Sequence, residues 1–297
     1  MTSVDICVAT YKRPVWLGQL LNDLAGQEMP DGDTLRVIVV DNDPECGAAH
    51  VAQAFESTRV ELLYLAQPVK NIALTRNMAL DHCSADWLAF VDDDERVPRN
   101  WICTLLACQE RFDADVVFGP VEGRLEANAP AWVRQSRFFV ASPTATGTPQ
   151  RWGATNNTLL RWKFVDGGAR FDARFGLSGG EDTHFFYGLS RRGAHMVWCQ
   201  EAVVTEHVPP DRTTLRWMLR RYFRGGQTFA DIVNRPAQPL GRLWWVLRRS
   251  AMLVLGAMLA VLAIPVDRGL AVRLAGKAAS YAGELSTLFR FRLQVYQ

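Results

Sequence analysis

Residues 87–95 read Trp-Leu-Ala-Phe-Val-Asp-Asp-Asp-Glu, an apolar run followed directly by four acids. Such a run is typical of a buried strand, and the acids then stand at its C-terminal end, where open α/β sheets bind ligands. Side chains two apart on an extended segment point the same way, so Asp92 and Asp94 can share one cation while Asp93 points elsewhere. Oxygen-only ligation suits Mg²⁺ or Mn²⁺ together with substrate phosphates. The alternative is a solvated acidic turn that caps a helix starting near Pro98.

The composition is that of a large folded protein. The chain has 297 residues, 48% of them hydrophobic, and a net charge of +2. The charge is unevenly distributed, because residues 1–208 carry 19 Lys/Arg against 27 Asp/Glu, whereas residues 209–297 carry 14 against 4. Six cysteines without a Cys-x-x-Cys pair favour a reduced, cytosolic compartment, and Cys7, Cys83 and Cys103 are expected to be buried. The N-terminus shows no secretory signal pattern.

Strand and helix patterns alternate along the first third of the chain. Strands are expected at 4–10, 35–40, 60–65 and 87–91, and helices from Pro14, at about 47–57 and at 71–80. This alternation predicts a doubly wound α/β half over residues 1–112. Residues 113–225 are the expected second half of one domain, with a strand at 115–121 and a loop-rich stretch at 123–150. Residues 226–297 form a basic, apolar helical tail.

The turn after the first strand is bulky and basic, since it reads Tyr11-Lys12-Arg13 instead of the glycines of a dinucleotide-binding turn. Cationic side chains beside a helix N-terminus can still face phosphates.

Asp41 ends the second strand, where it could accept hydrogen bonds from a base or ribose, or could close an Asx-Pro turn. Arg76 interrupts an apolar helix, and an exposed helical arginine is the simpler interpretation.

A second acidic site follows two glycines, Gly179 and Gly180. The glycines bring Glu181 and Asp182 to the first turn of a helix that continues to Arg192-Gly193, which suits either general-base chemistry or helix capping. Asn156 and Asn157 could bind sugar hydroxyls or form an Asx turn. His207, after a strand-like run, is a metal ligand or a structural histidine.

Five motifs taken together resemble a family 2 glycosyltransferase of the GT-A fold, over about residues 3–225. They are Val-Ala-Thr-Tyr-Lys-Arg-Pro at 8–14, Val-Val-Asp-Asn at 39–42, Arg-Asn at 76–77, Phe-Val-Asp-Asp-Asp at 90–94 and Gly-Gly-Glu-Asp at 179–182. Each is weak alone, but five in this order and spacing are specific. The chain looks similar to the bacterial succinoglycan-type exopolysaccharide glucosyltransferases.

The resemblance implies roles for the matching residues. The nucleotide-sugar, with UDP as the expected nucleotide, would contact Thr10, Tyr11, Arg13, Asp41, Arg76, Asp92 and Asp93. Asp94 and Asp92 would hold Mn²⁺ or Mg²⁺, with His207 as an extra ligand. Asp182 would be the catalytic base, with Glu181 beside it. The acceptor or sugar would contact Asn156, Asn157, Gly180, Arg216 and Trp217.

The implied reaction is an inverting, metal-dependent transfer of one sugar to a polyprenyl-pyrophosphate-linked saccharide. Processive relatives carry Gln-x-x-Arg-Trp, whereas the corresponding run here is Thr213-Thr214-Leu215-Arg216-Trp217, which favours single addition. Two other classes compete with this interpretation. A nucleotidyltransferase would need a Gly-rich basic signature after the first strand, and a non-enzymatic membrane or nucleic-acid adaptor would have no use for the acids. We expect no nucleic-acid partner, and the sequence leaves the oligomeric state open.

The tail predicts contact with the cytoplasmic face of the bacterial inner membrane. Residues 250–266 are uncharged over 17 residues, which is about 25 Å of helix against a hydrocarbon core of about 30 Å. Arg248 and Arg249 are expected at the interface with Trp244 and Trp245. Residues 269–289 look like an amphipathic helix with Arg273, Lys277, Ser280 and Glu284 on its polar face. A span, a re-entrant or in-plane helix, and a helix buried on the catalytic domain all stay possible, and the basic charge favours anionic lipid.

Overall fold

The computed structural model describes residues 1–297 except 31, 142, 235–237, 290 and 294–297. The chain forms two compact units. Unit 1 comprises Met1–Glu122 and Ala141–Glu206, and unit 2 comprises Gly123–Val140 and His207–Gln297. These units differ from the expected division at residue 225, because residues 207–225 group with the tail.

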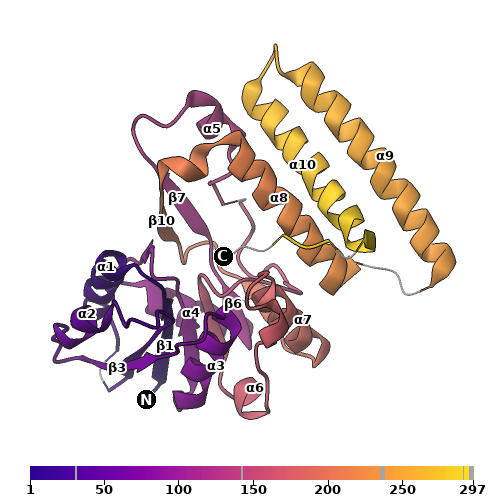
Figure 1. Cartoon of the computed structure of the whole chain (residues 1–297). Helices are drawn as coiled ribbons and strands as arrows, with labels where there is room; N and C mark the ends of the chain where they lie inside the picture. The colour runs from indigo at the N-terminus through magenta and orange to yellow at the C-terminus, as the bar shows by residue number, and fades with distance from the viewer. Residues whose placement is uncertain (31, 142, 235–237, 290, 294–297) are drawn as a thin grey trace. The chain divides into compact units, whose positions relative to one another are not determined.

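Unit 1 is built on a seven-stranded mixed sheet of order β3-β2-β1-β4-β8-β6-β9 (Figure 1). Strands β1, β2, β3 and β4 are parallel, β8 runs antiparallel between β4 and β6, and β9 is parallel to β6. The bounds are β1 (Ser3–Thr10), β2 (Thr34–Asp41), β3 (Val60–Ala66), β4 (Trp87–Phe90), β6 (Val116–Phe118), β8 (Thr158–Arg161) and β9 (Met196–Trp198). The predicted doubly wound α/β fold is confirmed, and its sheet is mixed.

Helices cover both faces of this sheet, as its mostly apolar central strands require. They are α1 (Pro14–Ala25), α2 (Ala49–Gln53), α3 (Ile72–His82), α4 (Trp101–Phe112), α6 (Lys163–Asp166) and α7 (Glu181–Arg191). One buried cluster joins the sheet to α1 and α4 through Leu17, Leu21 and Trp101. The other joins it to α3 and α7 through Leu80 and Phe186. The core therefore lies on both sides of β1 and β4, and the ends of these strands are held rigidly.

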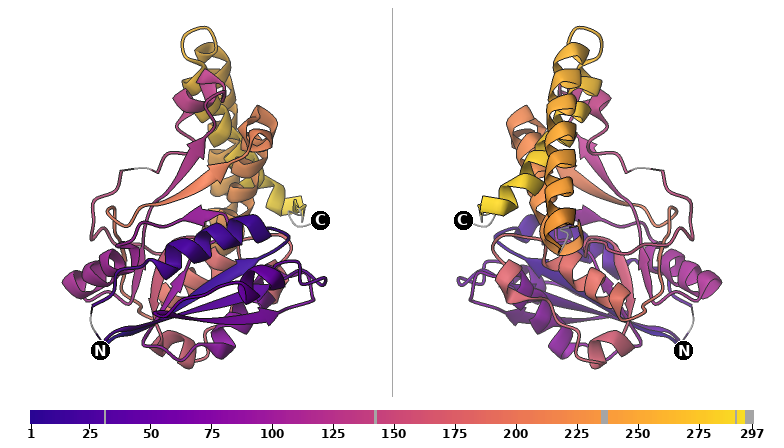
Figure 2. Two further views of the ribbon diagram at one scale, coloured as in Figure 1. Left: turned by 90° about the vertical axis from the view of Figure 1, so that its left-hand side faces the viewer. Right: turned by 90° about the vertical axis from the view of Figure 1, so that its right-hand side faces the viewer.

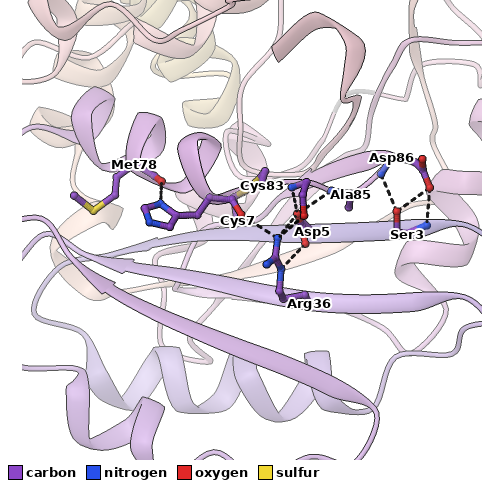
Figure 3. Close-up of polar contacts among 10 residues, drawn as sticks. Ser3, Asp5, Cys7, Arg36, Met78, Cys83, Ala85 and Asp86 are labelled. Atoms are coloured by element: carbon purple, nitrogen blue, oxygen red, sulfur yellow. Dashed lines mark hydrogen bonds and ion pairs between the residues drawn. The ribbon is translucent and has the colours of Figure 1, made fainter. Parts of the chain in front are cut away.

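An ion pair between the buried Asp5 and the half-buried Arg36 lies at the N-terminal end of the sheet (Figure 3). Arg36 donates from Nε to Asp5 Oδ1 at 2.8 Å and from Nη2 to Oδ2 at 2.7 Å. The backbone N–H groups of Ser84 and Ala85 donate to the same carboxylate at 2.8 and 3.1 Å. Asp5 thus has its charge and its acceptor positions matched within the chain.

Unit 2 is mainly helical. It contains α5 (Ala131–Ser136), α8 (Leu215–Phe229), α9 (Pro239–Ala263) and α10 (Arg268–Ser286). Helix α10 lies between α8 and α9 (Figure 1). The chain passes into unit 2 within β7 (Val121–Leu125), returns to unit 1 after Val140 and passes into unit 2 again within β10 (Val204–Val208). The Thr205–Glu206 part of β10 pairs with β5 (Glu95–Arg96) in unit 1.

One local expectation is refined by the structure and one is corrected. The stretch 123–150 is loop-rich as predicted, but it also contains the end of β7 and the helix α5, which begins directly after Pro130 because proline is well suited to a helix start. Cys103 is only half-buried, since it lies on the outer part of α4 with its thiol 2.8 Å from the Glu28 carbonyl oxygen. Cys7 and Cys83 are buried as expected, and all six cysteines are free thiols.

Candidate active site

The acids after β4 stand at the C-terminal end of the sheet, beside the end of β1. Parallel pairing sets Cys7 of β1 opposite Phe90 of β4, so the residues that follow each strand meet at one edge. Asp92 points outward, and its side chain is 42% exposed. Asp93 points inward and is buried, whereas Asp94 is half-buried. Asp93 and Asp94 lie in a turn and both face the Arg13 guanidinium, so their side chains do not alternate as they would on an extended strand. The ion shared by Asp92 and Asp94 stays a prediction.

Arg13 ties the acidic run to the turn after β1. Its Nη1 lies 2.9 Å from Asp93 Oδ1 and 2.8 Å from Asp94 Oδ2. Thr10 Oγ1 donates to Asp93 Oδ2 at 2.8 Å. The turn reaches this position through Lys12, whose φ of 56° is in the left-handed region. Arg13 is thereby fixed at the helix start, where its other guanidinium nitrogens can meet a phosphate.

Two carboxyl groups at this edge have strongly raised pKa values. Burial raises the pKa of Asp93 to about 6, with the Arg13 charge opposing the rise and Asp94 adding to it. Burial and the charge of Asp92 raise the pKa of Glu95 well above its ordinary value, although Glu95 accepts the Asp92 backbone N–H at 2.9 Å. Burial is the largest cause of both shifts, so both carboxyl groups keep their protons to a higher pH than exposed acids do.

Arg76 is buried, so the interpretation of an exposed helical arginine is wrong. It lies on the inner face of α3 with Ala73 and Leu80, and only 8% of it is exposed. Its Nη1 donates to Glu181 Oε1, and its Nη2 lies 3.6 Å from Asp92 Oδ1. Arg76 thus joins the acidic run after β4 to the second acidic site at α7.

The two glycines before α7 both adopt left-handed backbone, with φ of 77° at Gly179 and 96° at Gly180. This conformation is costly for other residues, and it brings Glu181 and Asp182 to the first turn of α7. Glu181 is buried and paired with Arg76, and burial raises its pKa against the effect of that arginine. Asp182 is half-buried, and among the described residues its Oδ1 accepts local bonds from Thr183, one from N–H at 2.6 Å.

The carboxylates of this site are of the ligand type that divalent cations such as Mg²⁺ and Mn²⁺ prefer. Six carboxyl groups, those of Asp92, Asp93, Asp94, Glu95, Glu181 and Asp182, gather around two arginines, Arg13 and Arg76. Within the described ranges, no three His, Cys, Asp or Glu side chains converge as a preformed metal site. An open pair of carboxylates is typical of Mg²⁺ or Mn²⁺ sites that substrate phosphates complete.

Asp41 closes a turn at the end of β2. Its carboxylate accepts the backbone N–H groups of Asp43 and Ala48 at 2.9 and 3.0 Å and the Tyr64 hydroxyl at 2.9 Å. Of the two interpretations of Asp41, the structure supports the turn role directly. The Tyr11 ring nearby has the ammonium groups of Lys12 and Lys70 at 5.6 and 5.1 Å from its centroid, which adds positive charge around this turn.

A cavity of about 320 Å³ lies next to the acidic site within unit 1. Residues 153–157 border both places, since Thr155 lines a small hollow with Arg76 and Asp92 while Ala154 and Asn156 line the cavity. The wall also includes Trp152, Trp198, Phe118 and Gln150. The Phe118 ring is 4.9 Å from that of Phe186, which follows Asp182 by one turn of α7. Sequence reasoning missed Trp152 and Trp198, because no local pattern marks two aromatic residues far apart in the chain.

The two predicted amides have different positions. Asn156 is half-buried in the cavity wall. Asn157 is buried, and its side chain donates to the carbonyl oxygens of Pro120 and Ala202 at 3.0 and 2.6 Å and accepts the Trp101 indole N–H at 2.8 Å. The amide of Asn157 is therefore bonded inside the fold, although the residue also lines the cavity, and its contact with a sugar stays a prediction.

Three predicted site residues belong to unit 2. The Trp217 ring stacks on Phe139 at 6.1 Å, with the Arg212 guanidinium 5.8 Å from its centroid. Arg216 is exposed on α8. His207 Nε2 lies 3.9 Å from a Glu126 carboxylate oxygen. Their roles in acceptor or metal binding stay predictions.

Comparison with known proteins defines the class. The model of glycosyl transferase family 2 matches residues 5–171, and the chain belongs to this family. It is therefore a glycosyltransferase, and the competing interpretations as a nucleotidyltransferase or a non-enzymatic adaptor are wrong. Among individual proteins, it is 37% identical over 287 residues to the succinoglycan biosynthesis protein ExoM of Rhizobium meliloti (strain 1021), covering 96% of this chain and 92% of that one. The predicted resemblance to succinoglycan-type enzymes is confirmed.

Solved structures share the GT-A fold at low sequence identity. The mannosyltransferase PcManGT from Pyrobaculum calidifontis, in complex with GDP-Man and Mn²⁺, matches with a TM-score of 0.62 and 17% identity, covering 95% of this chain and 86% of that one. Residues 1–349 of S. aureus TarS, in complex with UDP-GlcNAc, match with a TM-score of 0.53 and 15% identity, covering 97% and 92%.

Proposed function

We propose that this glycosyltransferase transfers one sugar, with inversion, from a UDP-linked donor to a lipid-linked saccharide during bacterial exopolysaccharide synthesis. The observation that carries the proposal is the different state of the two acids at α7. Glu181 is buried and paired with Arg76, whereas Asp182 is half-buried and has no cationic partner among the contacts described. One acid is thus held in place and its neighbour can take up a proton.

In the proposed reaction, Asp182 accepts the proton of the acceptor hydroxyl as that oxygen attacks the anomeric carbon. The bond from this carbon to the β-phosphate oxygen breaks on the opposite face, and a nucleoside diphosphate leaves. A single displacement inverts the anomeric configuration, so no carboxylate nucleophile is needed. Arg76 fixes Glu181 and Asp92, and Arg13 holds Asp93 and Asp94 beside the phosphates.

Asp92 and Asp94 would hold Mn²⁺ or Mg²⁺, which when bound neutralises the charge that develops on the diphosphate. The excess of carboxyl groups over arginines supports this assignment. The relative of known structure that contains Mn²⁺ shares the fold with this chain. His207 would be an additional ligand, and unchanged Mn²⁺ affinity in His207→Ala would remove it from the site.

The cavity bordered by Asn156 and Trp152 would bind the acceptor saccharide. Indole and phenyl faces suit the C–H faces of a sugar ring, and amides suit its hydroxyl groups. Phe118 connects the cavity wall to Phe186 on the helix that carries Asp182. A bound saccharide would therefore lie close to the base. The donor's nucleotide would lie along Thr10, Tyr11 and Arg13.

Asp182→Asn tests the proposed base. The amide keeps the size of the side chain but cannot take a proton, so transfer should fall by about 10²–10⁴-fold. Binding of UDP with Mn²⁺, measured as a thermal shift, should hardly change, because ligand stabilisation depends on the donor site alone. Glu181→Gln is the matched control, since it alters the neighbouring acid. If Glu181→Gln were inactive and Asp182→Asn active, the two roles would be reversed.

We further propose that the enzyme acts at the cytoplasmic face of the inner membrane. Within the described residues, one helix, Pro239–Ala263, is long and apolar enough to cross a membrane, with a mean hydropathy of 1.8. A polyprenyl-linked acceptor would be presented from the same surface.

A further inference from the structure

Helix α9 carries a wide apolar surface that the described residues of unit 2 leave uncovered. Only 11% of its most apolar window is buried, and the residues that face inward are Trp245, Gly256, Ala260 and Ala263. The exposed residues include Leu243, Trp244, Leu247, Val254, Leu255, Met258, Val261 and Leu262. In the right-hand view of Figure 2, α9 runs along the outside of the helical layer of unit 2. A large exposed apolar surface of this kind is typical of a site that contacts a membrane or another protein.

Helix α9 is fastened to α10 by a buried ion pair. Arg249 Nε lies 2.7 Å from Glu284 Oε2, and the two side chains are only 14% and 4% exposed. The guanidinium also lies 5.4 Å from the centre of the Tyr281 ring. Two sequence expectations are thereby corrected, since Arg249 does not stand at an outer interface and Glu284 does not face solvent. The pair fixes which side of α9 faces inward.

Helix α10 is packed along its length against the rest of unit 2. A side chain at Gly269 would collide with Gln135 of α5, and one at Gly276 would collide with Tyr222 of α8. Gly283 likewise lies against the Phe223 carbonyl, and Arg273 Nη1 donates to the Gln135 carbonyl at 2.7 Å. Helices α9, α10 and α8 therefore form one layered body (Figure 1).

This body carries charge that cannot enter hydrocarbon. Helix α8 exposes Arg216, Arg220 and Arg221, and α10 exposes Lys277. If α9 crossed the bilayer upright, α10 and α8 would follow it, and these side chains would enter the apolar core. At about 37 Å, α9 is long enough to span a bilayer, so its length does not distinguish a spanning helix from one that lies in the membrane plane. The attachment of α9 to α10 does distinguish them, because the charged side chains of α10 and α8 would have to enter the bilayer with it.

We infer that α9 lies in the plane of an anionic lipid surface, with its apolar face in the acyl boundary and α10 and α8 on the aqueous side. This inference rests on the proposed membrane location and adds the orientation of α9 at the membrane surface. Unit 2 contains 17 Lys/Arg against 5 Asp/Glu, which suits anionic head groups. Trp244 is 62% exposed with the Arg248 guanidinium 5.3 Å from its ring, an arrangement suited to the head-group level.

The test uses full-length protein with vesicles of phosphatidylcholine and phosphatidylglycerol. Leu240→Cys and Val266→Cys place thiols near the two ends of α9, where these residues are 83% and 84% exposed. The protein should float with the vesicles, and a membrane-impermeant maleimide added outside should label both thiols fully, with no gain after detergent. The wild-type chain gives the background, because its cysteines all lie in unit 1.

Each other outcome overturns the inference. Protection of one end until detergent is added would show a spanning helix, and absence of flotation would show that no bilayer is bound. A dimer in solution that does not float would show that a second copy covers the face.

Charge on the apolar face gives an independent readout. Met258→Glu should reduce the vesicle-bound fraction at least tenfold without lowering the thermal midpoint, because Met258 is 59% exposed. The matched control is Val15→Glu, an exposed apolar position on α1 of unit 1, which should still float. Equal flotation of Met258→Glu and wild type would contradict the inference. Release of UDP from the donor reports the proposed function separately, because a floating protein without transfer activity would leave the surface assignment intact.

Discussion

At the N-terminal end of the central sheet, Asp5 accepts two bonds from Arg36 and two from backbone N–H groups. At the C-terminal end, six carboxyl groups gather around Arg13 and Arg76, and the pKa values of Asp93 and Glu95 are raised. The first arrangement is balanced within the chain and stabilises the fold. The second is unbalanced, so it destabilises the free protein and is suited to a cationic ligand.

The largest change in transfer activity should come from removing one carboxylate at the C-terminal end of the sheet, where the acids outnumber the arginines. Asp94→Asn should lower transfer by about 10³-fold or more, because metal stabilisation of the leaving diphosphate contributes several kcal/mol. The melting temperature of the metal-free variant should stay nearly unchanged, since reduced repulsion among the acids offsets the loss of the Arg13–Asp94 ion pair. Donor turnover titrated with Mn²⁺ and thermal melts in EDTA measure both quantities.

Asp113→Asn is the control for Asp94→Asn, because Asp113 is an exposed acid of the same unit whose side chain is 93% accessible. It should leave turnover unaffected. Full activity of the wild-type enzyme in EDTA would rule out metal dependence.

At the N-terminal end of the sheet, a substitution should lower stability and leave turnover unchanged, the reverse of the result expected for Asp94→Asn. Asp5→Asn removes the anionic partner of Arg36 and should lower the free energy of unfolding by about 3 kcal/mol, the lower end of the range for buried pairs, because Arg36 is partly hydrated. The kcat of the folded enzyme should not change. Urea unfolding and steady-state kinetics at one temperature make the comparison.

Asp86→Asn is the matched control at the same end of the sheet, where Asp86 is exposed and bonded to Ser3 (Figure 3). Its cost should stay below about 1 kcal/mol. A cost equal to that of Asp5→Asn would show that burial of the Asp5 pair is not what matters.

Stability of the metal-free protein should fall as pH rises. The unfolded chain releases the Asp93 proton near its ordinary pKa of about 3.9, whereas the folded chain keeps it to about 6. The resulting stabilisation is fully present below about pH 4 and is lost as pH rises through about 6, which amounts to about 2 to 3 kcal/mol. Urea unfolding in EDTA across this range measures the loss.

Asp93→Asn should flatten that pH profile, because it removes the titrating group while keeping an oxygen acceptor for Thr10. Glu95 should leave a residual slope of the same sign. A profile identical to that of the wild type would mean that Asp93 does not carry the effect.

The smallest expected change is in acceptor binding at the cavity lined by Trp152 and Asn156, because the contact tested there is uncharged. Trp152→Ala should raise the acceptor KM by about tenfold, a loss of about 1.4 kcal/mol that is within the range for an aromatic contact residue. The donor KM and UDP affinity should stay the same. Trp152→Phe, which keeps an aromatic face, should recover most of the loss. An equal rise in donor KM would instead assign Trp152 to the donor site.

Much of unit 1 could be predicted from the sequence. The strands from Ser3 to Phe90 and their helices follow local periodicity, and the positions of Asp92, Asp94 and Asp182 follow from strand ends and a glycine turn. Such features depend on neighbours in the chain, so a short window of sequence contains them.

Other features depend on contacts between distant residues. Arg76 and Glu181 are 105 positions apart, and no local pattern distinguishes a buried helical arginine from an exposed one. The same holds for the cavity that Trp152 shares with Trp198, and for Asn157, whose partners come from three other segments.

The sequence by itself determined the family, the acidic motifs and the presence of an apolar, basic tail, because residue types and their spacing along one segment express these features. Only the tertiary structure decided which acid is paired and which is left available, and which face of the tail is covered. The ion pair of Arg76 in the described contacts of α7 is with Glu181, and Arg249 is paired with Glu284 inside the helical layer. The physical reason is that burial and charge pairing are properties of the packed molecule, since each depends on what the fold brings within a few ångströms.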